Sequence, residues 1–174
     1  EEIATAYGIS GKIREREGAG SFVAVPHGHF RCKDGKWIAI ACTTDKMFER
    51  LAEAMGQAEL SSSSLYGDQR KRLAARDLVN QIVIEWVGAL TRDEVMARCL
   101  EHEVPAGAVN SIADIFADPQ FAARGNLARF HEDDLGDVVV PGVIPRLSAT
   151  PGRITNLGPT LGNATDDVLT QLLH

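Results

Sequence analysis

The sequence predicts a mixed α/β fold: an α+β small domain in which helices pack on a short antiparallel sheet, followed by an extended segment and a C-terminal helix. Asp34-Gly35 separates two β-prone runs, and Asp-Gly is a strong hairpin signal because both central turn positions take a positive φ. Apolar residues recur at helical spacing between residues 44 and 104. Residues 141–159 hold four prolines and little periodicity, so they predict an extended path.

The hairpin follows a connector. Residues 10–20 have little periodicity and contain three glycines, so we interpret them as extended chain. Strands are predicted over residues 29–32 and 36–42, on either side of the turn. Because successive residues of the second run are apolar, we expect that strand to lie in the centre of its sheet, covered on both faces.

Two amphipathic helices are predicted after the hairpin. Thr44 or Asp45 can cap the first, and Gly56 supplies its stop. Its apolar residues form one stripe: Phe48, Leu51, Ala52 and Met55. The second helix runs from about residue 68 to residue 88. Its expected apolar face consists of Leu78, Ile82 and Trp86, with Val79 and Val83 beside it.

Later elements begin at recognisable caps. Thr91 and Glu94 form a capping box for a helix that ends before Pro105 and carries Val95, Cys99 and Leu100. A short strand is predicted over residues 106–109. Ser111 and Asp118 can cap two short helices. Strands are expected over residues 127–131 and 137–140, and a final helix over residues 166–173, with Thr165 as its cap.

Composition narrows the class of protein. The 174 residues carry a formal net charge of −6, and an acidic balance argues against nucleic-acid binding, which needs a basic face. Three widely spaced cysteines without a CxxC pattern favour neither a disulfide framework nor a zinc ribbon, so we expect a reducing, cytoplasmic location. The sequence contains no apolar run long enough to predict a membrane span. The first residues resemble neither an initiator segment nor a signal peptide, which suggests a piece of a longer chain.

Five phrases, in order, resemble the family III CoA-transferases, the family of L-carnitine dehydratase, bile-acid-inducible protein F and formyl-CoA transferase. The first is Pro26-His-Gly-His-Phe30-Arg-Cys-Lys-Asp34-Gly35-Lys-Trp37. The others lie at residues 104–109 (VPAGAV), 118–124 (DPQFAAR), 136–151 and 159–169 (PTLGNATDDVL). The resemblance spans most of this chain. It covers only the C-terminal half of a typical family member.

The resemblance implies a domain organisation. Residues 1–25 would be a connector from a Rossmann-like large domain, and residues 26–125 the small α/β domain. Residues 126–174 would be a return segment and a C-terminal helix that dock on the large domain, most of which precedes this chain. The full-length protein is expected to form an interlocked homodimer.

The resemblance also implies a reaction. Such enzymes move CoA between an acyl-CoA and a carboxylic acid through an aspartyl-CoA intermediate. The aspartate nucleophile would lie in the missing N-terminal half, so we assign no catalytic residue to this chain and expect it to be inactive alone. Coenzyme A is a substrate here, and no permanently bound cofactor or metal is expected.

The small domain is expected to contribute a lid that excludes water from the acyl intermediates. The candidate lid and substrate residues lie near the start of the chain: Gly18, Gly20, Pro26, His27, Gly28 and His29. A plain connector is the alternative for the glycines. The two histidines could face a substrate carboxylate, or could be exposed residues at a strand entrance. A metal site made with Cys32 is disfavoured because it lacks a fourth ligand.

Three further alternatives stay open. An α-methylacyl-CoA racemase-like member of the same family would share the fold but use acid and base groups of the large domain. A non-catalytic module could bind a CoA ester or a partner. The basic cluster at residues 70–72 is interpreted as a solvated face, with a contact to a CoA phosphate as the alternative.

Overall fold

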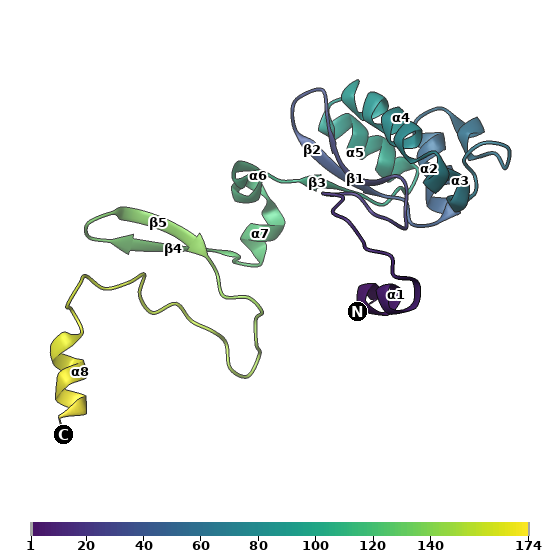
Figure 1. Ribbon diagram of the computed structural model, residues 1–174. Helices are drawn as coiled ribbons and strands as arrows, with labels where there is room; N and C mark the ends of the chain where they lie inside the picture. Colours follow the sequence, from purple (N-terminus) through teal and green to yellow (C-terminus); the bar gives the residue numbers. More distant parts are fainter. Residues whose placement is uncertain (1, 174) are drawn as a thin grey trace. The chain divides into compact units, whose positions relative to one another are not determined.

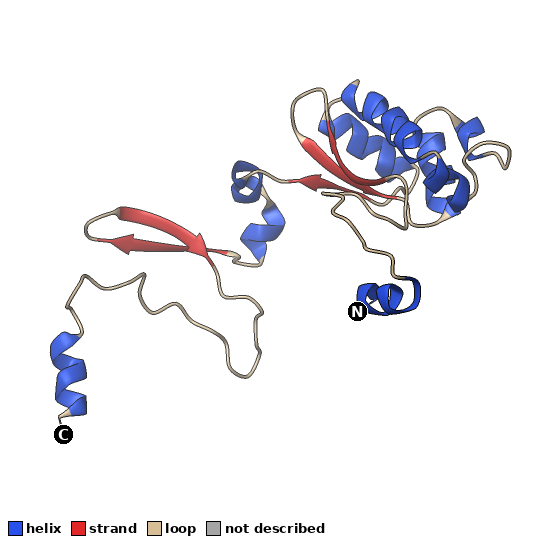
Figure 2. Ribbon diagram, in the orientation of Figure 1, coloured by secondary structure: helices blue, strands red, loops and turns tan. Residues whose placement is uncertain are grey.

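The computed structural model describes residues 2–173, which divide into two compact units at the Asn110–Ser111 peptide bond (Figures 1 and 2). The first unit contains α1 (Glu2–Ser10), β1 (His27–Arg31), β2 (Trp37–Ala41), α2 (Asp45–Ala54), the 3-10 helix η1 (Ala58–Ser61), α3 (Gln69–Ala74), α4 (Arg76–Gly88), α5 (Arg92–Glu101) and β3 (Ala106–Val109). The second contains α6 (Ile112–Ala117), α7 (Pro119–Ala123), β4 (Leu127–Glu132), β5 (Gly136–Pro141) and α8 (Thr165–Leu172). No helix formed by the described residues has the length and apolar composition of a membrane span.

The predicted mixed α/β fold with a short antiparallel sheet is confirmed. The first sheet has the strand order β1-β2-β3, and both strand pairs are antiparallel. The β1–β2 turn has a positive φ of 77° at Gly35, but Asp34 is not in the left-handed region. The expectation of two positive φ angles is therefore wrong at Asp34. The carboxylate of Asp34 instead accepts hydrogen bonds from the backbone N–H groups of Lys36 (3.3 Å) and Arg92 (3.4 Å), which ties the turn to the start of α5.

The central place of β2 in the sheet agrees with its apolar sequence. Ile38 and Ile40 are buried against α2, α4 and α5, which lie over one face of the sheet. On the opposite face Trp37 is 46% exposed and Ala39 is half-buried. The expectation that both faces are covered is wrong within this unit, because its packed helices all lie on the side of the isoleucines.

The core of the first unit lies between the sheet and the helices. Its largest fully buried apolar side chains include Phe48, Ile38, Ile40, Leu51, Val25, Val79, Val83, Val87 and Val95. The long helix expected from residue 68 is interrupted at Ala75, which has φ −106° and ψ 30°. After this break Val79, Val83 and Trp86 face the core, whereas Leu78 is 55% exposed. The predicted position of Leu78 is therefore wrong, and Leu100 of α5 is likewise exposed.

Most predicted helix starts are correct because the side chains that cap them act locally. The Thr44 hydroxyl accepts a hydrogen bond from the Met47 N–H, and complete capping boxes start α5 at Thr91 and α6 at Ser111. Asp68 caps α3 and Asp118 caps α7. Thr165 is the exception. It is the first residue of α8, which has Ala164 at its N-cap and no side-chain cap.

The second unit has elements but no core. β4 and β5 form an antiparallel hairpin, and no helix or strand lies between Pro141 and Thr165, as the prolines predicted. No side chain from residue 111 to residue 173 is buried. Exposed apolar residues include Val143, Ile144, Leu147, Leu161, Val168, Leu169 and Leu172. Since apolar surface is stabilised by burial, this unit has the composition of a segment that packs on another surface.

The division between the units falls at residue 110, whereas the sequence placed the end of the small domain at residue 125. The division at residue 110 reflects which residues contact one another within this chain. It does not show which residues belong to the small or the large domain of a longer protein. The assignment of residues 1–25, 26–125 and 126–174 to domains of a longer protein stays a prediction.

Candidate functional site

The candidate lid residues lie in one continuous region that leads into β1. Gly18 and Gly20 are exposed in a tight turn, which we call the glycine turn (residues 17–20). The Gly20 N–H donates to the Glu17 carbonyl over 3.1 Å, and Gly18 has a φ of 61°. The glycine turn lies against β1, because a Cβ added to Gly28 would be 3.6 Å from the Ala19 carbonyl oxygen. The structure thus brings the predicted glycines of the turn close to Gly28.

The chain between this turn and β1 is held by backbone contacts. We call residues 22–26 the anchored segment. The carbonyl of Val25 accepts a hydrogen bond from Arg72 Nε over 2.9 Å, and the Val23 carbonyl accepts one from the Gln69 side-chain amide. The Pro26 carbonyl accepts from the Cys42 N–H at 2.9 Å, which joins the segment to the end of β2. Pro26 itself is buried, so this end of the candidate site is part of the folded core.

Arg72 is the centre of this arrangement. Its side chain is completely buried, with each guanidinium nitrogen paired. Nη1 donates to the Tyr66 carbonyl (2.8 Å) and Nη2 to the Asp45 carboxylate (2.7 Å). The guanidinium carbon also lies 4.8 Å from the centre of the Phe48 ring, a cation–π distance. The interpretation of residues 70–72 as a solvated face is therefore wrong at Arg72.

Arg76 contacts the same region from the first turn of α4. Its Nη1 lies 2.7 Å from Glu17 Oε2, and its Nη2 donates to the Phe22 carbonyl over 3.3 Å. The side chains of Arg76 and Glu17 are 28% and 24% exposed. The Arg76 side chain is consequently more exposed than that of Arg72, although Glu17 Oε2 itself is buried.

The two candidate histidines lie on β1 with their side chains on the face opposite the core. Their neighbour Phe30 is buried, and strand side chains alternate between faces. His27 is half-buried, and its Nδ1 has no hydrogen-bond partner among the described residues, whereas His29 is exposed. Their cross-strand neighbours are Ala41 and Ala39, so the side chains next to the histidines on this face of the sheet are small. The role of His27 and His29 toward a substrate carboxylate stays a prediction.

Metal binding and thiol chemistry are not supported by the geometry. Across residues 2–173, no group of three or more His, Cys, Asp or Glu side chains is placed to hold a metal ion. Cys32, Cys42 and Cys99 are free and buried. Burial raises the pKa of the Cys42 thiol to about 12 and that of Cys99 to about 11. Burial, and then the nearby Asp34 carboxylate, also raises the pKa of Cys32. Thiols held protonated in this way are poor nucleophiles.

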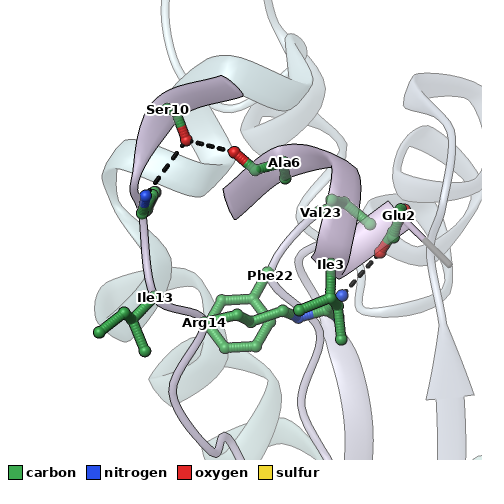
Figure 3. A pocket seen from close by; sticks show the side chains of 9 residues that line it. Glu2, Ile3, Ala6, Ser10, Ile13, Arg14, Phe22 and Val23 are labelled. Atoms are coloured by element: carbon green, nitrogen blue, oxygen red, sulfur yellow. Dashed lines mark hydrogen bonds and ion pairs between the residues drawn. The ribbon is translucent and has the colours of Figure 1, made fainter. Parts of the chain in front are cut away.

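A pocket of about 280 Å³ lies beside the anchored segment (Figure 3). Its walls come from α1, from residues 12–14, and from Phe22 and Val23. Figure 3 shows the Arg14 side chain crossing the Phe22 ring, with its guanidinium carbon 4.5 Å from the ring centre, to reach Glu2 at 2.6 Å. Because Arg14 already has an anionic partner, it forms a wall of the pocket rather than a ready anion site.

Sequence reasoning found the glycines and histidines but missed Gln69, Arg72 and Arg76. Arg72 lies in α3 and the apolar stripe of α4 begins after the break at Ala75, so helical spacing gave no signal for the burial of Arg72. Its partners at Val25 and Asp45 are remote in sequence, so only the tertiary structure could name them.

Comparison with known proteins gives consistent matches. The model for CoA-transferase family III matches residues 1–165. The succinyl-CoA–L-malate CoA-transferase alpha subunit of Chloroflexus aurantiacus is 75% identical over 173 residues, which are 99% of this chain and 40% of that protein. The beta subunit from the same species is 51% identical over 175 residues, covering 99% of this chain and 43% of that protein.

The fold also matches a solved structure. A CaiB/BaiF family protein from Brucella suis has a TM-score of 0.77 and 29% identity, and the match covers 98% of this chain and 44% of that one. The chain thus spans about two fifths of the length of the curated relatives described above.

Proposed function

The chain belongs to CoA-transferase family III, and from this membership we propose that it is part of an enzyme that moves coenzyme A from an acyl-CoA to a carboxylic acid. The observation that carries the proposal is the 75% identity, over 99% of the chain, to an alpha subunit named as a succinyl-CoA–L-malate CoA-transferase. We therefore propose succinyl-CoA as the donor and L-malate as the acceptor. The names of these relatives favour the transferase over the racemase-like alternative.

The proposed mechanism is covalent. An aspartate carboxylate attacks the thioester carbonyl of the acyl-CoA, the C–S bond breaks, and CoA thiolate leaves to give a mixed anhydride. The thiolate then attacks the aspartyl carbonyl, which releases the donor acid and leaves an aspartyl-CoA thioester. The acceptor carboxylate attacks that thioester, and the CoA returns to the new acyl group in the same two steps, which regenerates the aspartate. We propose that this aspartate lies in a large domain contributed by other residues of the full-length protein, because no residue of this chain is assigned that role.

The contribution of this chain would be to cover the reacting groups. Mixed anhydrides and thioesters are hydrolysed when water reaches them, so a transferase gains from a segment that excludes water. The glycine turn and Gly28 form the proposed covering surface, and His27 and His29 are proposed as substrate ligands on the other face of β1. The proximity of Ala19 to Gly28 supports treating the glycine turn and Gly28 as one unit.

We also propose that residues 126–174 pack on the large domain. The lack of any buried side chain in residues 111–173, together with several exposed leucines and valines, supports this placement. The related alpha and beta subunits support an assembly of two family members, with the interlocked homodimer as the simpler form. Three free buried thiols agree with a reducing, cytoplasmic compartment.

The test uses the full-length parent protein with succinyl-CoA and a panel of acids that includes L-malate, and follows CoA esters by chromatography and mass spectrometry. A malyl-CoA product, together with an aspartyl adduct trapped by hydroxylamine, is expected. α-Proton exchange on a 2-methylacyl-CoA without CoA transfer would instead establish the racemase-like reaction. Native mass spectrometry, alone and after co-expression with a beta-type subunit, distinguishes the homodimer from a mixed assembly.

A further inference from the structure

One arginine contacts both the glycine turn, at Glu17, and the start of the anchored segment, at Phe22. Arg76 holds the Glu17 carboxylate with one guanidinium nitrogen (2.7 Å) and the Phe22 carbonyl with another (3.3 Å). Only residues 18–21 lie between these two attachment points. The planar, forked guanidinium can serve two acceptors at once in a fixed geometry, which an ammonium group cannot reproduce.

We propose that Arg76 is a positioning residue that clips the glycine turn against β1, and so sets how well the acyl intermediates are shielded from water. The inference rests on the proposed transferase function and names a residue of its covering surface. Arg76 acts through Glu17 and Phe22 and need not touch a substrate.

Arg76 holds a different part of the chain from Arg72 and Gln69. Arg72 is fully buried and Gln69 holds Val23, so the chain from Val23 onward stays fixed to α3. The Arg76 and Glu17 side chains are 28% and 24% exposed, whereas that of Arg72 is completely buried. Gly18 and Gly20 are exposed, and the positive φ of Gly18 is a conformation that glycine adopts without strain. Loss of the clip would free the turn and leave the anchored segment in place.

A specific kinetic consequence follows. Each donor molecule consumed yields either a new CoA ester or free CoA from hydrolysis. Freeing the turn admits water, so the hydrolysed fraction rises while the chemistry of transfer remains possible. A residue that merely stabilised the fold would lower both products together.

The experiment compares the full-length protein with its Arg76→Ala, Arg76→Lys and Glu17→Gln variants. Arg98→Ala is the matched control, because it removes an exposed arginine from α5. We expect Arg76→Ala to raise the hydrolysed fraction several-fold at an unchanged melting temperature. Arg76→Lys should restore part of the shielding through Glu17, and Arg98→Ala should behave as wild type. Glu17→Gln leaves the α4 side chains intact and should show a smaller rise, which keeps the test valid if Arg76→Ala fails to fold.

Hydrogen exchange separates failure of the clip from failure of the proposed function. The Gly20 N–H is bonded to the Glu17 carbonyl inside the turn, so its exchange should accelerate in Arg76→Ala and not in Arg98→Ala, whether or not CoA is transferred. Faster exchange in a protein that transfers no CoA would support the clip and overturn the transferase. Unchanged exchange in both Arg76→Ala and Glu17→Gln would overturn the clip, and so would an unchanged hydrolysed fraction in an active enzyme.

Discussion

Arg72 illustrates how a charged residue can belong to a core. Its ion pair with Asp45 is half open to solvent, since Asp45 is 56% exposed, and pairs of that kind contribute only about 0–1 kcal/mol. Leaving the buried Val25 carbonyl without a donor would cost more, about 1–3 kcal/mol. The main role of Arg72 is therefore to satisfy the backbone carbonyls of Val25, before β1, and of Tyr66, before α3, and the charge pair is secondary.

The cysteines yield a prediction at the same scale. Because burial raises the pKa of Cys42 to about 12 and of Cys99 to about 11, neither forms a reactive thiolate in the folded chain near pH 8. We expect iodoacetamide to label none of the three cysteines before unfolding and all three in urea, as read by mass spectrometry.

The same pKa shifts determine how the free energy of unfolding changes with pH. Unfolded thiols lose their protons near the ordinary pKa of 9.0, whereas the folded ones keep them. The resulting stabilisation is complete below pH 9.0 and is lost as the pH rises toward the folded pKa values. Labelling of Cys42 in the folded protein at about pH 8 would contradict this account.

At the scale of elements, local signals and packing gave different kinds of information. Caps and turns depend on neighbouring residues, so Thr44, Thr91, Ser111 and Asp118 could be read from sequence. The face of α4 could not, because both Leu78-Ile82-Trp86 and Val79-Val83-Trp86 are apolar at helical spacing, and only packing selects the second. Two adjacent residues were therefore exchanged in the prediction, with Leu78 placed in the core and Val79 beside it.

Substitution to alanine tests this register of α4. Leu78→Ala should change the free energy of unfolding by less than about 0.5 kcal/mol, as for other exposed positions. Val79 is 1% exposed, so Val79→Ala should cost about 2 kcal/mol through lost burial and an unfilled cavity. Urea denaturation of the two variants provides the comparison, and a larger loss for Leu78→Ala would restore the register first predicted.

At the scale of the whole chain, the two units differ in their source of stability. Among residues 2–173, every buried apolar residue lies between Ala24 and Val104. Residues 111–173 contain three helices and a hairpin but bury no side chain. An isolated two-stranded hairpin and short helices are marginally stable in water, so this unit needs a covering surface that these residues do not supply.

Hydrogen exchange of the 174-residue chain and of the full-length parent tests that conclusion. In the 174-residue chain alone, amides of β2 and α4 should exchange slowly, and those of β4, β5 and α8 should exchange rapidly. In the full-length protein the second group should become protected, because the large domain would cover it. Slow exchange of β4 and β5 in a verified monomer of the shorter chain would contradict the prediction.

The sequence by itself determined the mixed α/β class, the hairpin, most helix caps, the extended path after Pro141 and the family, since each depends on neighbouring residues or on ordered phrases. It also pointed to Gly18, Gly20 and Gly28. Only the tertiary structure decided which face of β2 is covered, which side of α4 is buried, and that Arg72 and Arg76 hold the segment before β1. The arginine contacts join residues 47 and 54 positions apart, and neither spacing nor composition specifies which faces and side chains meet in the folded chain.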